Sequence, residues 1–388
     1  MINNYNIKIE NIDIETNMSK SIYRSFNYIG SKIKLINFLH KTIETYSGKK
    51  LEEIKSFADL FAGTGVVSFH FMKNGCKKII TNDIQHYSYT ISSIWNLKNI
   101  NIDKIKELVI ELNKKNDKIT EENIISTEKD FIYNNYTEFC QEPKKYFTTL
   151  NGFKIDKTRQ AIEKYFIKEK INDSEYRLLI KILLYSTTKI SNIASVYGSF
   201  LKKFKKTSLS SLFLDISMIE PFLNDKNVDH QYYNLPILDL LEKNSMKNIE
   251  IVYLDPPYNN RRYDHNYHLL ETISKYDNPE IKGKTGTRKI DNKSALYSKK
   301  CEIEFSEIIN SIKSKYLFIS YNSESILSKE KMIELLEKKW FDVRCYEKTY
   351  TKFKTTKTGE ILPILEYLFC ASSESYLYIS MDRLNINS

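Results

Sequence analysis

The stretch SFADLFAGTGVVSFHFMKNGCKKIITNDI, residues 56–84, decides the fold. It opens with a short apolar run that predicts a buried strand. A turn containing Gly63 and Gly65 follows, and then an apolar segment that predicts a helix ending at Gly75. A second apolar run, KKIITN, stops at the acidic Asp83. Strand, glycine turn, helix and strand at this spacing are typical of half of a doubly wound α/β sheet.

The rest of the sheet is predicted after a long interruption. Residues 25–46 have helical spacing and precede the first strand, and further strand patterns appear only after about residue 230. These patterns are IEIVYL at 249–254, KYLFISYN at 315–322, FDVRCYEKTY at 341–350 and LPILEYLFCA at 362–371, the last two as hairpin partners. We therefore predict a polar arm at 1–20, an α/β domain formed by 21–100 and 230–388, and a mainly helical domain inserted at 101–229.

The charge of the chain favours an anionic partner. The 388 residues carry a formal net charge of +10 and are 41% hydrophobic, which indicates a globular protein attracted to nucleic acid or to a membrane surface. Residues 143–206 hold 15 Lys and Arg against 5 Asp and Glu, and 15 − 5 = 10 equals the excess of the whole chain. Aromatic side chains are interleaved among them. Helices with solvated lysine faces would give the same pattern, so the charge alone leaves both interpretations open.

Membrane, secretory and metal-binding signals are not found in the sequence. No apolar run approaches the ~20 residues that cross a bilayer, and the first residues lack the basic start and apolar stretch of a secretory signal. The five cysteines are scattered, with no C-x-x-C pair and no Cys/His cluster. We therefore expect free thiols in a reducing cytoplasm and no structural metal.

The sequence Asp255-Pro256-Pro257-Tyr258 follows the predicted strand IEIVYL, at the end of an α/β strand where ligands bind. The amine of adenine is a poor nucleophile, because its lone pair is delocalised into the ring. A site that methylates it needs acceptors for both amine hydrogens, and a carboxylate with a carbonyl held by two stiff prolines can supply them. The ring of Tyr258 offers a surface for a base to stack on. A proline-rich turn with an exposed aspartate is the alternative.

The glycine turn and the acid after the second strand suggest a cofactor site. Residues Asp59 to Gly65 contain a G-x-G step, but the third glycine of a dinucleotide site and the G-K-[ST] of a triphosphate site are missing. Such a turn lets a ligand lie close to the backbone, although a turn without a ligand would use the same glycines. Asp83 is suited to binding ribose hydroxyls or to capping a helix.

Together these motifs resemble the Dam-type family of adenine-N6 DNA methyltransferases. Asn27 to Lys32 is similar to the lead motif of that family, although relatives often carry Lys where this chain has Asn27. The resemblance implies a Rossmann-like methyltransferase sheet, S-adenosylmethionine as cofactor, and an inserted target-recognition domain. It assigns catalysis to Asp255, Pro256, Pro257 and Tyr258. It assigns cofactor binding to Tyr28, Gly30, Lys32, Asp59, Phe61, Gly63, Gly65, Asp83, Ile84 and Asp255.

The same resemblance places double-stranded DNA against the basic insert, with the target base flipped out of the helix. Residues 196–200, VYGSF, are similar to a family loop that reaches DNA. The residues predicted to bind DNA are Lys202, Lys203, Lys205, Lys206, Arg261 and Arg262. A solvated loop is the alternative for residues 261–268. The acid expected near Pro236 is missing, and Asp239 is the candidate substitute.

Three rival functions stay open at this point. Cytosine N4 and guanine in ribosomal RNA are other amines methylated by enzymes with Pro-Pro-Tyr motifs. Asp255 at the first position of the motif favours adenine over cytosine, and the long basic insert favours duplex DNA over RNA. A DNA-binding subunit that keeps the fold without catalysis is the third rival. The family also leads us to expect membership of a restriction-modification system, with a restriction endonuclease acting separately.

Overall fold

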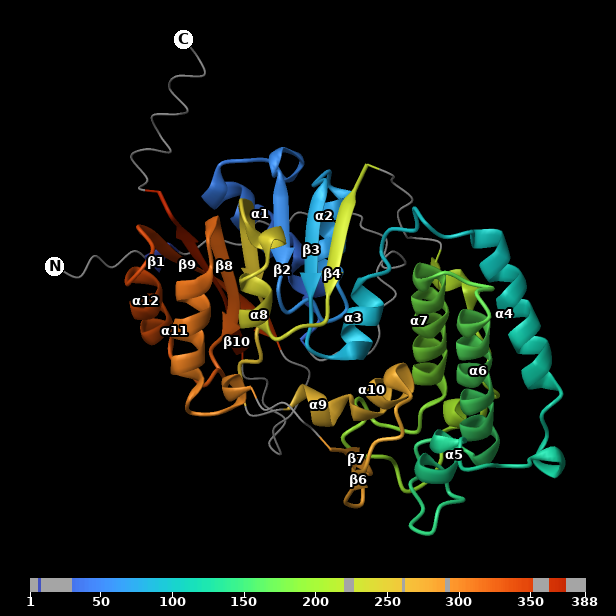
Figure 1. Ribbon diagram of the computed structural model, residues 1–388. Coiled ribbons are helices and arrows are strands. Elements are labelled where there is room, and N and C mark those ends of the chain that lie inside the picture. Colours follow the sequence, from blue (N-terminus) through green and yellow to red (C-terminus); the bar gives the residue numbers. More distant parts are fainter. Residues whose placement is uncertain are drawn as a thin grey trace.

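In the computed structural model, residues 6–7, 30–219, 227–259, 262–289, 294–351 and 363–374 are described. They include an eight-stranded sheet with the order β1-β9-β10-β8-β5-β2-β3-β4 (Figure 1). The strands are β1 (Asn6–Ile7), β2 (Ser56–Asp59), β3 (Lys78–Asn82), β4 (Asp229–Tyr233), β5 (Ile249–Leu254), β8 (Ser314–Asn322), β9 (Asp342–Thr351) and β10 (Pro363–Ser372). The predicted α/β sheet is therefore confirmed, and the hairpin of β9 and β10 lies where it was expected. Two residues of the predicted N-terminal arm also join the sheet as β1.

The strand order reverses between β2 and β5. From β2 the chain builds outward through β3 to β4 at one edge, whereas β5 lies on the opposite side of β2. β2, β3, β4, β5 and β8 are parallel, and β10 runs antiparallel between β8 and β9. In open α/β sheets, the carboxyl ends of the strands at such a reversal form the ligand-binding crevice. Asp59 ends β2 and pairs with Tyr253 of β5, so both strands end at this crevice.

Helices cover both faces of the sheet, as the alternation along its strands requires. Phe57 and Ile251 point to the face covered by α1 (Ile36–Ser47) and α2 (Val66–Lys73). Their neighbours Ala58 and Val252 point to the opposite face. The helices on that face are α8 (Ile237–Leu241), α11 (Cys301–Ser311) and α12 (Lys329–Glu337).

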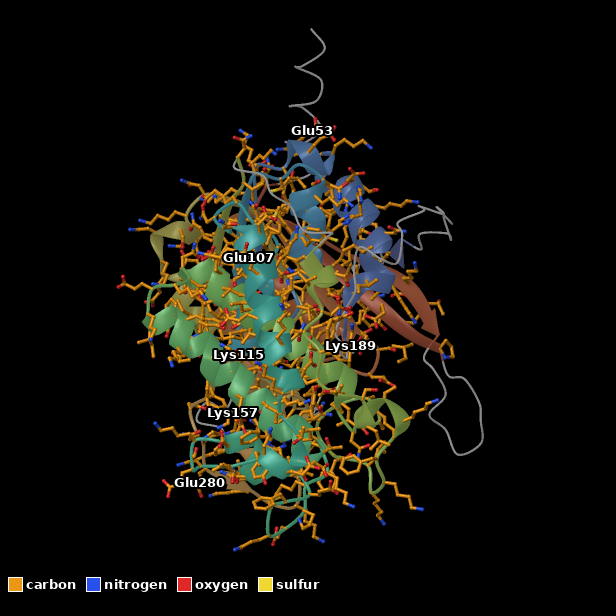
Figure 2. All side chains as sticks on the ribbon, turned by 90° about the vertical axis from the view of Figure 1, so that its right-hand side faces the viewer. Glu53, Glu107, Lys115, Lys157, Lys189 and Glu280 are labelled. Carbon is orange, nitrogen blue, oxygen red and sulfur yellow. The ribbon has the colours of Figure 1, made fainter. Side chains whose placement is uncertain are left out.

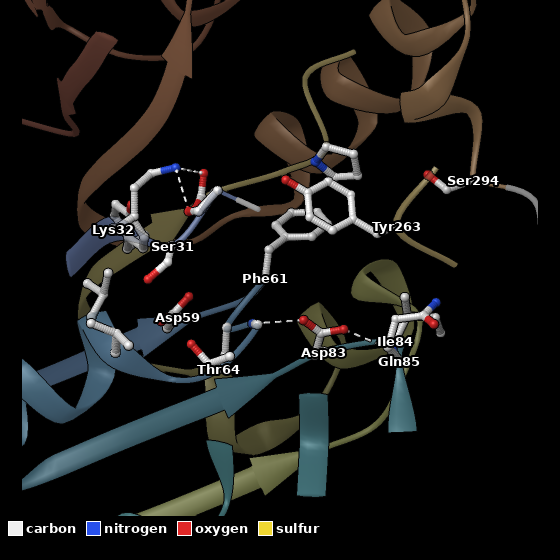
Figure 3. Close-up of a pocket in the computed structure, with 18 of the residues that line it drawn as sticks. Ser31, Lys32, Asp59, Phe61, Thr64, Asp83, Ile84, Gln85, Tyr263 and Ser294 are labelled. Atoms are coloured by element: carbon white, nitrogen blue, oxygen red, sulfur yellow. Dashed lines mark hydrogen bonds and ion pairs between the residues drawn. The ribbon is translucent and has the colours of Figure 1, made fainter. Parts of the chain in front are cut away.

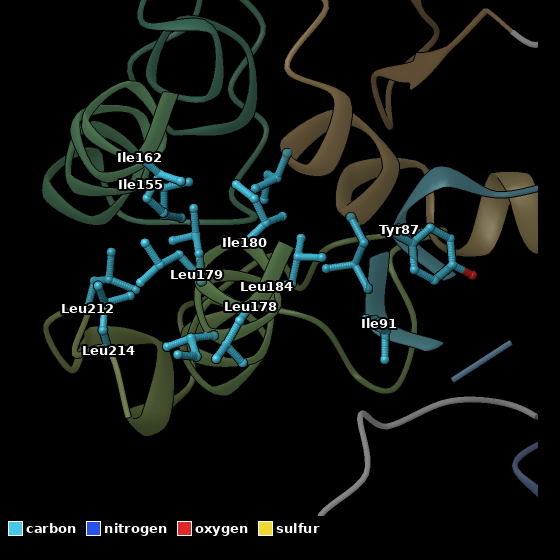
Figure 4. Close-up of a cluster of buried hydrophobic side chains, with 14 of the residues drawn as sticks. Tyr87, Ile91, Ile155, Ile162, Leu178, Leu179, Ile180, Leu184, Leu212 and Leu214 are labelled. Carbon is cyan, nitrogen blue, oxygen red and sulfur yellow. The ribbon is translucent and has the colours of Figure 1, made fainter. Parts of the chain in front are cut away.

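The helical region, residues 86–219, lies beside the sheet in Figure 1. Its helices are α3 (His86–Ser92), α4 (Ile102–Asp117), α5 (Phe131–Tyr136), α6 (Thr149–Ile167) and α7 (Asp173–Ile190). α7 begins with a capping box, in which Asn172 and Glu175 bond each other's backbone N–H. Most of its residues are buried, because it lies in the centre of the region. Its side chains pack against α3 and α6 (Figure 4).

A helix from beyond the catalytic motif shares this core. α10 (His268–Lys275) contributes Leu269, Leu270 and Ile273 to the same apolar cluster. It is connected to β5 through the short helix α9 (Tyr263–Asn266), and the hairpin of β6 (Ile281–Lys282) and β7 (Thr287–Arg288) follows it. α10 thereby fixes the helical region against the carboxyl edge of the sheet.

The positive charge concentrated in residues 143–206 does not all reach the surface. Five of its basic residues are buried: Lys144, Lys154, Arg159, Arg177 and Lys181. On the outer face of the helical region (Figure 2), two further lysines of this stretch lie beside acids: Lys157 pairs with Asp130, and Lys189 with Asp215. Much of this charge therefore stabilises the region itself. No helix among the described residues is long and apolar enough to cross a membrane.

Candidate active site

One cleft lies at the carboxyl ends of β2, β3 and β5, at the strand reversal (Figure 3). It has about 780 Å³ of empty space, including its opening to solvent. Most of the residues predicted to bind a cofactor line it, together with one more residue of the catalytic motif: Gly30, Lys32, Asp59, Phe61, Gly63, Asp83, Ile84, Asp255 and Pro257. The structure therefore brings together residues from the segment before α1, from the first α/β unit and from the end of β5.

The remaining predicted residues lie beside the cleft or outside the described residues. The hydroxyl of Tyr258 lies 3.9 Å from the position that a Cβ atom would take at Gly30. Gly65 is the last residue of the glycine turn and packs against Trp95 and Ser92. Pro256 is buried just after β5. Tyr28 and Arg261 are not among the described residues.

The glycine turn, residues 62–65, is held by Asp83. Gly63 and Gly65 have φ of +52° and +74°, a backbone conformation that favours glycine. The N–H of Gly63 donates to one carboxylate oxygen of Asp83 at 2.8 Å, and the N–H of Gln85 donates to the other at 2.8 Å. Burial raises the pKa of Asp83 to about 7, and these two hydrogen bonds oppose the rise. Asp83 therefore organises both the turn and the entry to α3, and it still faces the cleft.

Asp59 has one carboxylate oxygen without a partner. Its Oδ2 accepts from the hydroxyl of Ser68 at 2.9 Å, whereas its buried Oδ1 has no hydrogen-bond partner in the described structure. Burial raises the pKa of Asp59 to about 7, and the nearby carboxylates of Asp255 and Asp83 act in the same direction. Because a buried acceptor is costly when unsatisfied, the orphaned oxygen fits a cationic donor on a ligand. Three carboxylates in one cleft favour a positively charged ligand as a whole.

Asp255 forms an ion pair with Lys32. The Lys32 Nζ lies 2.7 Å from Oδ1 of Asp255 and 5.9 Å from the centre of the Tyr258 ring. Burial opposes the charge of Lys32, but the attraction of Asp255 and its neighbours outweighs it, and the pKa of Lys32 is raised. Burial likewise raises the pKa of Asp255, and Lys32 opposes that rise. Lys32 was predicted to touch a cofactor; it also contacts the predicted catalytic carboxylate.

Tyr263 closes one side of the cleft, near Phe61 in Figure 3. Its hydroxyl lies 2.7 Å from where a Cβ atom at Gly30 would be, and Gly30 has a φ of +82°, a backbone conformation that favours glycine. Burial raises the pKa of Tyr258, and a hydrogen bond with Tyr263 acts in the opposite direction. Other lining residues had no role in the sequence prediction: Ser31, Thr64, Gln85, Ser294 and Tyr297. The first three lie within or beside the motifs, whereas no local pattern marks Ser294 and Tyr297.

A second cavity adjoins the first and shares Phe61, Ile84 and Tyr297 with it. Pro236 and Asp239 line this cavity, next to the carboxyl end of β4. The side chain of Asp239 is exposed. It lies in this adjacent cavity and stays the candidate for the acid expected near Pro236.

The residues predicted to bind DNA differ in their surroundings. Lys202, Lys203 and Lys206 are exposed, whereas the Lys205 Nζ donates to the carbonyl of Ile193 at 2.8 Å. Arg262 forms an ion pair with Asp264 at 2.5 Å. The VYGSF segment is anchored next to the cleft, since the N–H of Tyr197 donates to the carbonyl of Asn266 at 2.8 Å.

A doubly wound sheet, with a glycine turn and three carboxylates meeting in one cleft at its strand reversal, defines a Rossmann-like α/β protein with a candidate cofactor site. Comparison with known proteins gives the particular family. The pattern of the D12 class N6 adenine-specific DNA methyltransferases matches residues 28–335, and the chain belongs to this family. The family is specific for adenine N6, which decides against cytosine N4 and ribosomal guanine.

Several curated proteins are similar over most of the chain. The type II methyltransferase M.NlaIII of Neisseria lactamica is 36% identical over 86% of this chain and 93% of its own length. The type II methyltransferase M.FokI of Planomicrobium okeanokoites is 32% identical over 88% of this chain and 52% of its own length. The type II methyltransferase M.CviAII of Paramecium bursaria Chlorella virus 1 is 30% identical over 88% of this chain and 97% of its own length.

Proposed function

We propose that the chain methylates the N6 amine of an adenine flipped out of duplex DNA, and that Asp255 to Tyr258 form the site of transfer. The observation that carries this assignment is the position of Asp255, which shares one cleft with the glycine turn, Asp59 and Asp83. The acceptor of the amine and the proposed cofactor site are thus adjacent. Proximity and fixed electrostatics supply most of the rate enhancement for such a transfer.

The cleft fits S-adenosylmethionine. Its ammonium and sulfonium groups are cationic, and the orphaned oxygen of Asp59 and the three carboxylates suit that charge. Asp83 has lone pairs left to accept from ribose hydroxyls, and the glycine turn lets a ligand approach the backbone. When bound, the cofactor supplies a methyl group already activated by its sulfonium. Gly30, Lys32, Phe61, Gly63 and Ile84 complete the proposed cofactor site.

Residues of the catalytic motif are proposed to make the adenine amine more nucleophilic. Asp255 accepts one amine hydrogen and the Pro256 carbonyl accepts the other, which draws the nitrogen toward a tetrahedral geometry. Tyr258 provides the stacking surface for the flipped base. As the new C–N bond forms, Asp255 is placed to hold the proton that the amine gives up. Lys32 keeps Asp255 ionised and fixes its orientation.

Cofactor affinity is expected to rise with pH through neutrality. The carboxyl of Asp59 has a pKa of about 7 before a cation binds, so at pH 6 most of it must first lose a proton. The ionisation of Asp59 alone should therefore place affinity at pH 6 roughly tenfold below the plateau at pH 8, with protons released on binding. Titration calorimetry in buffers of different ionisation enthalpy measures this release. Asp59→Asn should bind weakly and with a flatter pH profile, leaving the part due to Asp83; an unchanged profile would remove Asp59 from the cofactor site.

Duplex DNA is proposed to lie against the lysine-rich segment, residues 196–206, which carries the exposed lysines. Replacing Lys202, Lys203 and Lys206 together with alanine should weaken DNA binding. It should also lower the slope of log affinity against log salt by roughly 1 for each phosphate that is no longer neutralised. A triple alanine variant of Lys55, Lys247 and Lys313 is the charge-matched control, because these exposed lysines precede β2, β5 and β8 at the opposite edge of the sheet. An equal weakening of DNA binding in both variants would contradict the assignment.

We further propose that the enzyme modifies one DNA sequence in a restriction-modification system. It would act in the cytoplasm, with residues 101–229 as target-recognition domain and a restriction endonuclease acting separately. The type II methyltransferases similar to the chain support this role. Sequencing genomic DNA for N6-methyladenine, with and without the gene in a host that lacks adenine methylation, should show a single modified sequence. Modified cytosine, or no modified base, would contradict the proposal.

A further inference from the structure

Trp95 lies between the glycine turn and the helical region. Its indole Nε1–H donates to the carbonyl of Thr64 at 2.9 Å, and its side chain is 5% exposed. The same nitrogen lies 2.6 Å from where a Cβ atom at Gly65 would be. The indole therefore sits directly against the turn, and Thr64 on the other side of that contact lines the cleft.

The helix that follows the turn is held by the same ring. Phe69 of α2 stacks on Trp95 with ring centres 4.4 Å apart and an angle of 21° between the planes. A displacement of the indole would therefore move both the carbonyl of Thr64 and the first turns of α2. These are the parts of the fold that place the backbone of the cofactor site.

Lys181 of α7 forms a cation–π contact with the indole of Trp95. Its Nζ lies 3.9 Å from the centre of the Trp95 ring and donates to the carbonyls of Ile91 and Ile94 at 3.0 Å each. The lysine is buried, and burial lowers its pKa well below the ordinary value. The π face of the indole and the carbonyls at the end of α3 act against that burial and favour the ammonium. Figure 4 shows α3 and α7 packed side by side at this point.

The same helix anchors the segment proposed to meet DNA. α7 ends at Ile190, and the Asn192 side chain just beyond it donates to the carbonyls of Lys145 and Leu201. It also accepts from the N–H of Lys205 at 3.0 Å. A continuous chain of contacts thus runs from the lysine-rich segment through α7 and Lys181 to Trp95 and the glycine turn.

We propose that Trp95 is a positioning residue of the cofactor site, and that Lys181 makes its placement depend on the helical region. Duplex DNA on the lysine-rich segment and the cofactor at the glycine turn then strengthen each other's binding. The inference rests on the proposed function, since it takes the cleft as the cofactor site. Coupling between two sites of this kind typically changes affinity by about 5- to 150-fold.

The first test compares the two tryptophans of the chain. Trp95→Phe keeps an aromatic ring but leaves the buried Thr64 carbonyl without its donor, so S-adenosylhomocysteine should bind about tenfold more weakly in calorimetry. With DNA saturating, the KM for S-adenosylmethionine should rise while kcat changes little. Trp340→Phe is the matched control, because Trp340 is equally buried and its Nε1 has no acceptor in the described structure. Wild-type cofactor affinity in Trp95→Phe would overturn the positioning role.

The second test measures coupling. S-adenosylhomocysteine affinity is determined with and without a duplex carrying the sequence found modified, in wild type, Lys181→Met and Lys154→Met. Lys154 is also buried, but it belongs to α6 and donates to Ser211, whereas Lys181 donates to the carbonyls beside Trp95. The ratio of the two affinities should fall toward one in Lys181→Met and stay as in wild type in Lys154→Met. An unchanged ratio in Lys181→Met would overturn the link, while methylation by wild type would still stand.

Trp95 also reports on the glycine turn directly. In Trp340→Phe it is the one remaining tryptophan, so its emission reflects its own surroundings. S-adenosylhomocysteine should shift that emission, and Lys181→Met in the same background should reduce the shift that DNA causes. A Trp95 emission spectrum that does not change when S-adenosylhomocysteine is added would contradict the positioning role. If wild type modified no adenine, the proposed function would fail, yet the calorimetry of Trp95→Phe and the emission of Trp95 in Trp340→Phe would still decide the positioning role.

Discussion

Replacing Asp255 with alanine is expected to lower the rate of methyl transfer by about 10²–10³-fold or more, with the cofactor still bound. The carboxylate is the proposed acceptor for an amine hydrogen, and without it the nitrogen keeps its delocalised lone pair. The glycine turn, Asp59 and Asp83 are left in place, so cofactor binding should change far less than turnover. Single-turnover incorporation of a labelled methyl group into DNA measures the first quantity, and calorimetry with S-adenosylhomocysteine the second.

The control for this experiment must take account of Lys32. Removing Asp255 alone leaves a buried ammonium without its 2.7 Å partner, and breaking a buried pair in this way commonly costs about 3–5 kcal/mol of stability. The double variant Lys32→Met with Asp255→Asn removes both charges, keeps similar volumes, and should recover stability without recovering activity. Thermal unfolding of the three proteins separates a folding defect from a catalytic one. Full activity in Asp255→Ala would refute the catalytic role.

The meeting of Asp59, Asp83 and Asp255 was predictable from the sequence. Each follows an apolar strand pattern, and parallel strands bring their carboxyl ends to the same edge of a sheet. The pairing of Lys32 with Asp255 was not predictable in this way. It depends on how the segment before α1 crosses the end of β5, and no local pattern records that crossing.

The basic insert shows where composition misleads. A lysine or arginine on a helical segment has the same sequence pattern whether its charged group is solvated or buried against carbonyls. The structure shows that Arg159 and Lys181 belong to the second kind. The place of α10 was also beyond the sequence, because an apolar helix after the catalytic motif could pack on the sheet as well as on the helical region. The burial of these basic side chains and the position of α10 both depend on long-range packing, which cannot be read from charge counts.

Replacing Lys32 with methionine is expected to move the acidic limb of the activity profile to higher pH. Burial already raises the pKa of Asp255, and Lys32 is the group that opposes the rise. Without the ammonium, the pKa of Asp255 should climb further. A protonated Asp255 is a poorer acceptor, so transfer is lost as pH falls through this pKa and recovered as pH rises above it. An opposite charge at this distance shifts a carboxyl pKa by roughly 1–3 units, so activity at a pH on the acidic limb of the profile should drop by about tenfold or more.

Recovery with pH distinguishes this electrostatic role from a structural one. The rate of Lys32→Met should climb toward that of wild type as pH rises above the raised pKa of Asp255, whereas wild type should already have reached its plateau at a lower pH. Lys34→Met is the matched control, because Lys34 is exposed in the same short 3-10 helix, η1 (Lys32–Leu35), and should keep the wild-type profile. A loss of equal size at every pH would mean that Lys32 serves the cofactor alone, as its place in the lead motif first indicated. Since Lys32 precedes α1 and Asp255 follows β5, a pH-dependent loss would show that the lead motif contributes to the chemistry as well as to binding.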